Sequence, residues 1–336
     1  MFLKRICVFL IIVSVLILTL GSVSIAKDAE YREIAWSSVG LGGSAHMLLS
    51  AIGAVINRAE PSLKITVQPT GGSVENPRLM RDKVIDICHT VHGYNAFYGK
   101  GPFKGEESLE DLMFLFTLYE NGSYFVTMED SDIESIDDLK GKTVSFWTMG
   151  SAAKIWAQAI LDAYGILDQV EATYPGGNAQ YDFLRDGSID AAISYSSGNI
   201  PSPSLYQADK MMGLRFLKID ESKLKKIIED KYQWFGITKI TADSLENLDE
   251  DTIALADYSC QYADSRLNEE DAYKIVKTIY ESIDEIKTYH KLGSTLSPEK
   301  ALDGCHADIP VHPGAVKYYK EIGVWRDDLK VGKIEN

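Results

Sequence analysis

A strand, a glycine-containing loop and a helix follow one another three times in this chain, and this repeat limits the possible folds most. The clearest copy spans residues 65–99. Its β-branched residues 65–67 favour an extended strand, Gly71 and Gly72 end that strand, and Leu79 belongs to an apolar helical face. Ordered alternation of strands and helices is typical of α/β proteins with mainly parallel sheets and helices on both faces.

Two other copies show the same order. In one copy the strand spans 31–39, the loop spans 40–44, and the helix ends at Pro61. In the other copy the strand spans 143–147, the loop spans 150–153, and the helix ends at Gly165. In an open α/β sheet, ligands bind at the carboxyl ends of the strands, and free amide groups at a helix start attract carboxylate or phosphate. We therefore predict an anion-binding site here, with Ser73 as a helix N-cap. Gly-Gly-Ser is also common in plain turns, so that reading stays open.

Two long apolar runs, 112–128 and 252–264, are expected to carry the chain between two domains and to act as a hinge near 116–124 and 252–260. The first contains Asn121-Gly122, which suggests a pair of strand segments. Other patterns predict a capped helix near 135, strands at 170–174, 189–198 and 213–219, a helix ending at Gly187, and helices at 223–231, 268–289, 297–302 and 312–323.

The first 26 residues resemble a signal peptide. Lys4 and Arg5 precede an apolar run, and small residues stand before position 27. We predict cleavage after Ala26 and export to the periplasm, with an uncleaved anchor as the alternative. The remaining length suits two lobes, which we place at 27–118 plus 256–336 and at 119–255.

A net charge of −15 disfavours nucleic acid as a partner. Three cysteines follow the predicted cleavage site: Cys88, Cys260 and Cys305. There is no CxxC motif, and an odd number cannot pair completely. Cys88 and Cys260 lie in apolar runs and are predicted to be buried thiols, and a bridge between Cys260 and Cys305 remains open.

The candidate ligand-binding residues lie at the predicted strand-to-helix edges. Hydroxyls and backbone amides there can donate to an anion, histidines can recognise it as imidazolium, and aromatic rings can hold its apolar part, although each has an ordinary role in capping or core packing. The candidates are Gly42, Gly43, Ser44, His46, Thr70, Gly71, Gly72, Ser73, His89, Thr90, Tyr94, Trp147, Gly150, Ser151, Tyr195, Ser197 and Tyr258. No arginine falls in these loops, so a guanidinium clamp is not expected.

Three other functions are alternatives to an anion-binding transport receptor. His46, His89 and His92 suggest a zinc receptor, but the odd spacing of His89 and His92 puts them on opposite faces of a strand. A dinucleotide enzyme would need an acidic residue after the second strand, where residues 68–70 read Gln-Pro-Thr, and no GxSxG or HExxH occurs. We therefore predict no enzyme and no cofactor. An exported sensor cannot be separated from a transport receptor by sequence.

Four blocks carry a resemblance to a known family. They are TGGSVENPRLM at 70–80, SIDDLKGKTVSF at 135–146, LRDGSIDAA at 184–192 and HPGAVKYYKEIG at 312–323. In this order they resemble the solute receptors of the TAXI subfamily (TRAP-associated extracytoplasmic immunogenic proteins) of TRAP transporters. The resemblance implies a bilobed periplasmic binding-protein fold that closes on a small carboxylate such as glutamate or 2-oxoglutarate. It also implies delivery to a TRAP-type membrane permease, and we expect a monomer.

The chain departs from this family at three loops. A TGGTGGTYY-like start is replaced by residues 38–46, which end in Ala45 and His46. Gln-Ser-Asp after the second strand is replaced by residues 89–91, and Pro-Gly-Ser-Gly-Thr by residues 149–153. Backbone donors survive these changes, whereas selectivity for glutamate is not implied.

Overall fold

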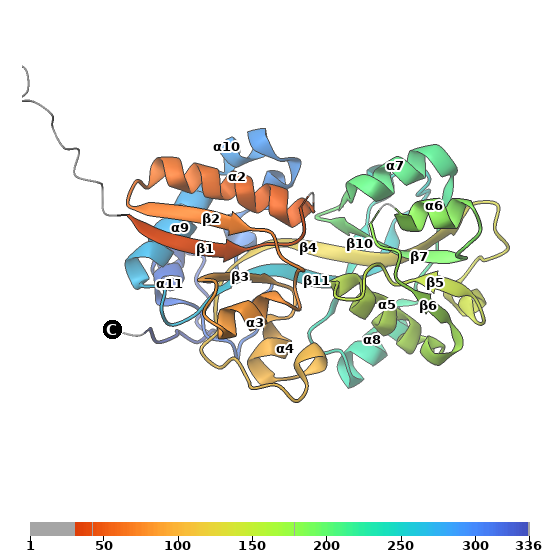
Figure 1. The fold of residues 1–336 in the computed structure, drawn as a ribbon, viewed down its shortest axis with the longest axis horizontal. Coiled ribbons are helices and arrows are strands. Elements are labelled where there is room, and N and C mark those ends of the chain that lie inside the picture. The colour runs from red at the N-terminus through yellow and green to blue at the C-terminus, as the bar shows by residue number, and fades with distance from the viewer. Residues whose placement is uncertain (1–30, 42, 178, 335–336) are drawn as a thin grey trace, which may run out of the picture.

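The computed structural model describes residues 31–41, 43–177 and 179–334, which form two lobes side by side (Figure 1). The predicted signal peptide and its cleavage site lie outside the described residues. The strands are β1 (Arg32–Ser37), β2 (Leu63–Gln68), β3 (Ile87–Thr90), β4 (Met113–Met128), β5 (Thr143–Ser145), β6 (Glu171–Thr173), β7 (Ala191–Ser197), β8 (Ile200–Pro201), β9 (Leu214–Phe216), β10 (Gly236–Ile240) and β11 (Thr252–Ala263). The helices are α2 (Ser44–Ala59), α3 (Asn76–Arg81), α4 (Gly93–Tyr98), α5 (Ala152–Ala163), α6 (Ala179–Arg185), α7 (Pro203–Met212), α8 (Glu221–Asp230), α9 (Glu269–Glu281), α10 (Ile283–Tyr289) and α11 (Pro313–Glu321).

The predicted α/β fold with two lobes is confirmed, but its sheets are joined. One path of hydrogen-bonded strands runs β2-β1-β3-β11-β4-β7-β5-β6 through both lobes. Pairing is parallel between β1 and its neighbours β2 and β3, and between β5 and its neighbours β6 and β7. The central strands β4 and β11 are antiparallel to each other, from Met113 opposite Ala263 to Ser123 opposite Leu255. Two parallel arrays are therefore linked by an antiparallel pair.

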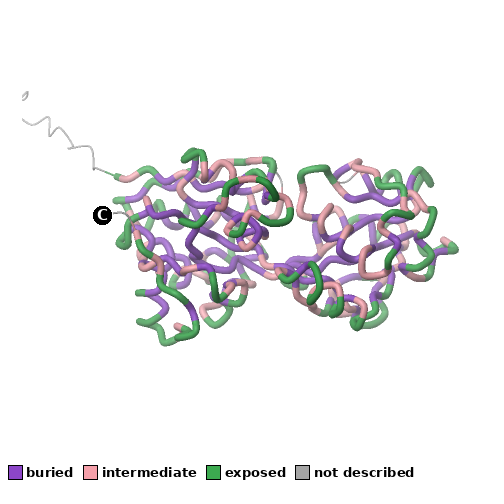
Figure 2. Tube along the Cα trace, turned by 90° about the horizontal axis from the view of Figure 1, so that it is seen from below, coloured by how far each residue is buried: buried purple, intermediate pink, exposed green. Residues whose placement is uncertain are grey.

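Each lobe has its own hydrophobic core, and β4 and β11 pass from one core to the other. On β4, Phe114 and Phe116 belong to the first core and Tyr124 and Phe125 to the second. On β11 the order is reversed, because that strand returns to the first lobe. Figure 2 shows the chain narrowing to this mostly buried connection between the lobes. The predicted lobe boundaries fall within or beside these strands and stay a prediction.

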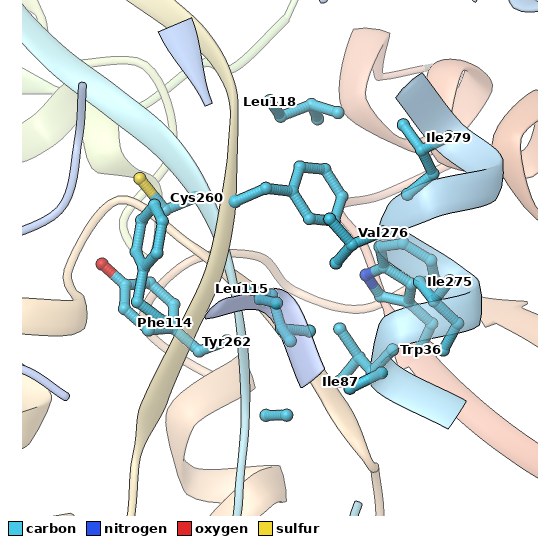
Figure 3. Close-up of a cluster of buried hydrophobic side chains, with 14 of the residues drawn as sticks. Trp36, Ile87, Phe114, Leu115, Leu118, Cys260, Tyr262, Ile275, Val276 and Ile279 are labelled. Carbon is cyan, nitrogen blue, oxygen red and sulfur yellow. The ribbon is translucent and has the colours of Figure 1, made fainter. Parts of the chain in front are cut away.

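The first core is centred on aromatic and branched side chains between the sheet and helix α9. Figure 3 shows Trp36, Val276 and Ile279 close together there, with Phe114 and Tyr262 across the strands. Trp36 is fully buried and meets the ring of Phe116 edge-on at 6.0 Å between centroids. Full burial of so large a ring stabilises the lobe by about 3 kcal/mol or more, judged from the cost of truncating such side chains. The indole N–H of Trp36 also donates to Gln261 Oε1.

Several local predictions are corrected by the structure. Asn121 and Gly122 continue β4 and do not turn, because β11 and β7 pair with them on both sides. The helix predicted at 268–289 is two helices, α9 and α10, which meet at Ser282. Residues 298–300 form only a short 3₁₀ turn. Helix α7 and strand β10 were not predicted.

All three described cysteines are buried free thiols, so the open bridge between Cys260 and Cys305 is not formed. The prediction of buried thiols at Cys88 and Cys260 is confirmed. Within the described residues, none of the helices has the length and apolar character needed to cross a membrane.

A cleft between the lobes

A cleft of about 600 Å³ lies where loops of both lobes face each other. Residues that follow β1 and β2 line it on the first lobe, and residues that follow β5, β6 and β8 line it on the second. Its floor is the central strand pair, through Tyr119 and Asn121 on β4 and Ser259 on β11. The cleft therefore touches both lobes and the strands that connect them.

The starts of three helices border this cleft. The lining includes the N-cap and first residues of α2, α5 and α7, namely Gly43, Ser44 and Ala45, Ser151, Ala152 and Ala153, and Ser202, Pro203 and Ser204. Amides in the first turn of a helix have no acceptor within the helix, and the helix dipole adds positive potential at this end. Helix α2 belongs to the first lobe and helices α5 and α7 to the second, so both lobes direct this potential to one space.

The loop at residues 70–73 contributes to the cleft differently from the prediction. The amide of Gly71 donates to the Glu75 carboxylate, and the amide of Gly72 donates to Thr70 Oγ1 at 3.1 Å. Ser73 is not an N-cap, since α3 begins at Asn76 and has six residues. The amides predicted to be free at positions 71 and 72 are therefore occupied, one by the Glu75 carboxylate and the other by the Thr70 hydroxyl.

His89 lines the cleft as a neutral ring. It is 2 % exposed, and burial lowers its pKa to about 4, so the predicted imidazolium is wrong for this residue near neutral pH. Its Nδ1 lies 2.8 Å from Gln261 Nε2, and Gln261 Oε1 accepts the indole N–H of Trp36 at 2.7 Å. Because the Trp36 indole can only donate, the amide oxygen of Gln261 must face it and the amide nitrogen must face His89.

An aromatic wall, which we define as Trp147, Tyr195 and Trp156, stands on the second lobe. Ring centroids are 5.6 Å apart between Trp147 and Tyr195 and 5.4 Å apart between Trp156 and Tyr195. Trp147 has φ of 67°, a left-handed conformation that costs a bulky residue roughly 1–3 kcal/mol. The fold holds this ring beside the cleft at an energetic cost, which is common at binding sites.

A buried carboxyl group, that of Asp257, contacts two residues of the cleft lining. Asp257 is 1 % exposed and accepts from Asn121 Nδ2 at 2.8 Å and from the indole N–H of Trp156. Burial raises the pKa of Asp257 to about 7. Ser197 Oγ donates to Asn121 Oδ1 at 2.9 Å, so this network joins β4, β7, β11 and α5. Two of its members, Asn121 and Trp156, line the cleft.

The structure brings most of the predicted site residues to one place. Those that line the cleft are Gly43, Ser44, Thr70, Gly71, Gly72, Ser73, His89, Trp147, Ser151 and Tyr195. Outside the lining are His46, Thr90, Tyr94, Gly150, Ser197 and Tyr258, and Gly42 lies outside the described residues.

The predicted residues outside the lining have other contacts. His46 Nδ1 lies 2.8 Å from Ser38 Oγ, and Thr90 Oγ1 donates to the Ser73 carbonyl at 2.7 Å. Tyr94 packs on His306 with ring centroids 4.7 Å apart. Tyr258 lines a second cavity of about 340 Å³. These side chains support the loops without bordering the cleft.

Our reading of the sequence missed several lining residues. They are Tyr119, Asn121, Trp156, Ser202, Ser204 and Ser259, together with apolar neighbours such as Val39, Leu41 and Val91. A signal was present for some of them. Asn121 is a polar residue inside an apolar run, and Ser202-Pro203 is a typical helix start. Tyr119 and Ser259 carried no such signal.

The alternative of a zinc receptor would need a set of metal-binding side chains near the cleft. Within the described parts of the chain, no group of three or more His, Cys, Asp or Glu side chains is placed to hold a metal ion. His92 is fully buried, with Nδ1 3.4 Å from Asn95 Nδ2, and it is not in the cleft lining.

The sequence pattern of the NMT1-like family matches residues 38–323. The chain belongs to the NMT1-like family. This match covers both lobes and all loops of the cleft. It does not identify the predicted TAXI subfamily.

Several solved structures are similar to this NMT1-like protein at low sequence identity. XAC2383 from Xanthomonas citri bound to chloride ion is 10% identical over 86% of this chain and 95% of that chain, with a TM-score of 0.50. A putative L-cystine ABC transporter protein from Listeria monocytogenes is 13% identical over 80% and 98%, with a TM-score of 0.47. The periplasmic aliphatic sulphonate binding protein SsuA from Escherichia coli is 17% identical over 77% and 74%, with a TM-score of 0.43. The likeness to the XAC2383 structure is one of overall fold.

Proposed function

We propose that this protein is an extracytoplasmic solute-binding receptor that captures a small carboxylate between its lobes. One observation carries the proposal: the starts of α2 on one lobe and of α5 and α7 on the other border the same cleft. A carboxylate accepts hydrogen bonds from the first-turn amides of α2 and α5, and the helix dipoles favour its charge. In α7, Pro203 has no N–H and the Leu205 amide donates to Ser202 Oγ, so this helix contributes mainly its dipole. Hydroxyls of Ser44 and Ser259 supply further donors along the lining. The ligand is bound and released without chemical change.

Binding would favour a closed state of the two lobes. A ligand that touches both lobes lowers the free energy of the closed form relative to the open form. The bend would fall in β4 and β11 near Asn121 and Gly122, where the strands leave one core and enter the other. An added Cβ at Gly122 would lie 2.5 Å from Ile240 Cδ1, so the strands pack tightly at this point.

The four sequence blocks that resemble TAXI receptors support a TRAP-type permease as the partner. In this proposal residues 1–26 direct export to the periplasm, and the mature monomer delivers its ligand to that permease. Uptake in cells tests the partner type. Transport that depends on this gene and collapses with an ion-gradient uncoupler, but not with ATP depletion, is expected. Dependence on ATP alone would assign the receptor to an ABC-type permease instead.

A melting-shift screen tests the ligand class. The protein starting at residue 27 is mixed with 2-oxo acids, amino acids, dicarboxylates, sugars and divalent metal ions. A cognate carboxylate at 100 times Kd should stabilise the folded state by about 2.7 kcal/mol, and the shift should grow with concentration. Small-angle scattering should show a smaller radius of gyration in the same complex. A response to a sugar or a metal ion, with silence from every carboxylate, would reject the proposal.

A further inference from the structure

The cleft contains no charged side chain to pair with a cation. Among the described residues that line it, none is Asp, Glu, Lys or Arg, and its one histidine, His89, is neutral near pH 7. The helix starts give it positive potential instead. An ammonium group brought into this space would lose water without gaining a carboxylate, which is costly for a buried charge.

Two carboxylates lie near the cleft, but both have other partners. Glu75 is exposed, accepts from the Gly71 amide, and is not in the lining. Asp257 is buried, is not in the lining, and already accepts hydrogen bonds from Asn121 and Trp156. Neither carboxylate is placed to receive an ammonium group of a ligand in the cleft.

The aromatic wall does not replace a carboxylate by forming a cage. An aromatic cage that binds an ammonium group combines several accessible ring faces. Trp156 is 5 % exposed and Tyr119 is 7 % exposed, so most of their surface is already covered by the protein. Only Trp147 and Tyr195 are partly exposed beside the cleft. Two partly exposed rings suit the apolar body of a ligand better than a cation.

From these observations we infer that the ligand is a carboxylate that carries no ammonium group, with its apolar body against Trp147 and Tyr195. The inference rests on the proposed function and narrows its substrate class from amino or organic acids to organic acids. The cleft selects against the amino acid because a C2 ammonium would find only neutral acceptors there, whereas a C2 oxo group can accept hydrogen bonds from amides and hydroxyls.

Matched pairs of compounds test the inference, because they differ only at C2. Calorimetry with 2-oxoglutarate and glutamate, phenylpyruvate and phenylalanine, and 2-oxoisocaproate and leucine should give Kd at least tenfold lower for the oxo acid of the pair that binds best. Tighter or equal binding of the amino acid, or of glycine betaine, would overturn the inference and leave the carboxylate receptor intact. Silence from every carboxylate, oxo acids and amino acids alike, would overturn both.

A substitution in the lining provides a second readout. Ser204 is partly exposed near the start of α7, where an acidic residue favours the helix, so Ser204→Asp should fold. The added charge should weaken oxo-acid binding at least tenfold and reduce the preference over the amino acid by a similar factor. Ser204→Asn, similar in size but neutral, should keep the wild-type preference. A preference unchanged in Ser204→Asp would mean that charge in the cleft does not decide selection.

Discussion

Gln261 Nε2 lies 2.8 Å from His89 Nδ1, and this contact determines how His89 faces the cleft. The Gln261 amide is oriented by the indole of Trp36, so its nitrogen donates to Nδ1 and the remaining ring proton is on Nε2. A residue of the hydrophobic core therefore sets the tautomer of a residue in the lining. His89 offers a neutral N–H donor, which suits an anionic or oxo ligand without requiring a charge.

Replacement of His89 tests this donor. His89→Gln keeps an N–H of similar reach and should change affinity for the best carboxylate less than tenfold, with altered selectivity. His89→Leu removes the donor and should weaken binding about tenfold or more, since a hydrogen bond to a charged group contributes about 1.5–3 kcal/mol. Titration calorimetry measures both. His92→Gln is the control, because His92 is buried outside the lining. Wild-type affinity for every ligand in His89→Leu would remove His89 from the site.

Two substitutions of Trp147 should affect ligand binding alike but protein stability differently. Trp147→Gly and Trp147→Ala both remove the ring and should weaken ligand binding about tenfold. Only glycine accepts φ of 67° without strain, so the glycine variant should be about 1 kcal/mol more stable than the alanine variant. Urea unfolding and calorimetry provide the two measurements. Equal affinity in the variants and wild type would show that the strained ring does not contact the ligand.

Asp257 should make the protein less stable as pH rises. Its folded pKa of about 7 lies above its unfolded value of about 4, so between these values the folded state holds a proton that the unfolded state has lost. The stability from this proton is complete below pH 4, declines by at most about 1.4 kcal/mol per pH unit, and is gone above pH 7.

Three buried histidines change the pH dependence of stability in the opposite direction. They are His89, His92 and His312. Burial lowers their pKa to about 4, so their contribution to stability is lost as pH falls.

The difference in stability between Asp257→Asn and wild type isolates the effect of Asp257. Measured by urea unfolding, the stability of Asp257→Asn relative to wild type should increase from pH 4 to 7 and then stay constant. A difference independent of pH would show that Asp257 ionises as it does in the unfolded chain.

Gly314 should be essential for packing in the first lobe. A Cβ at this position would lie 2.3 Å from the Glu269 carbonyl oxygen and 2.7 Å from the Tyr273 amide nitrogen, and both are backbone atoms of α9. Because the backbone cannot move aside cheaply, Gly314→Ala should lower the unfolding free energy by about 2 kcal/mol or more. Gly150→Ala is the control, since nothing lies within 4 Å of its added Cβ. Similar stability of the two variants would contradict this close contact of α11 with α9.

Local sequence patterns predicted the order of elements well where they were long or bounded by glycine and proline. The strand, loop and helix units led to α2 and α5, and the apolar runs led to β4 and β11. They failed where pairing overrides a local preference. Asn121 and Gly122 resemble a turn, yet strands on both sides keep them extended.

The candidate site was predicted in part for the same reason. Loops that follow strands must meet at one sheet edge, so Ser44, Thr70 and Ser151 could be found from local patterns. Tyr119 and Ser259 lie within strands, and Trp156 lies inside a helix. Their approach to the cleft depends on how the lobes are joined.

The amino-acid sequence alone determined that this chain forms an α/β protein with helix starts at the ends of its strands, because hydrophobic period and turn residues act over a few positions. Only the tertiary structure decided that His89 stays neutral and that α7 joins α2 and α5 around the cleft. These outcomes depend on burial and on contacts between distant segments, which no local pattern encodes.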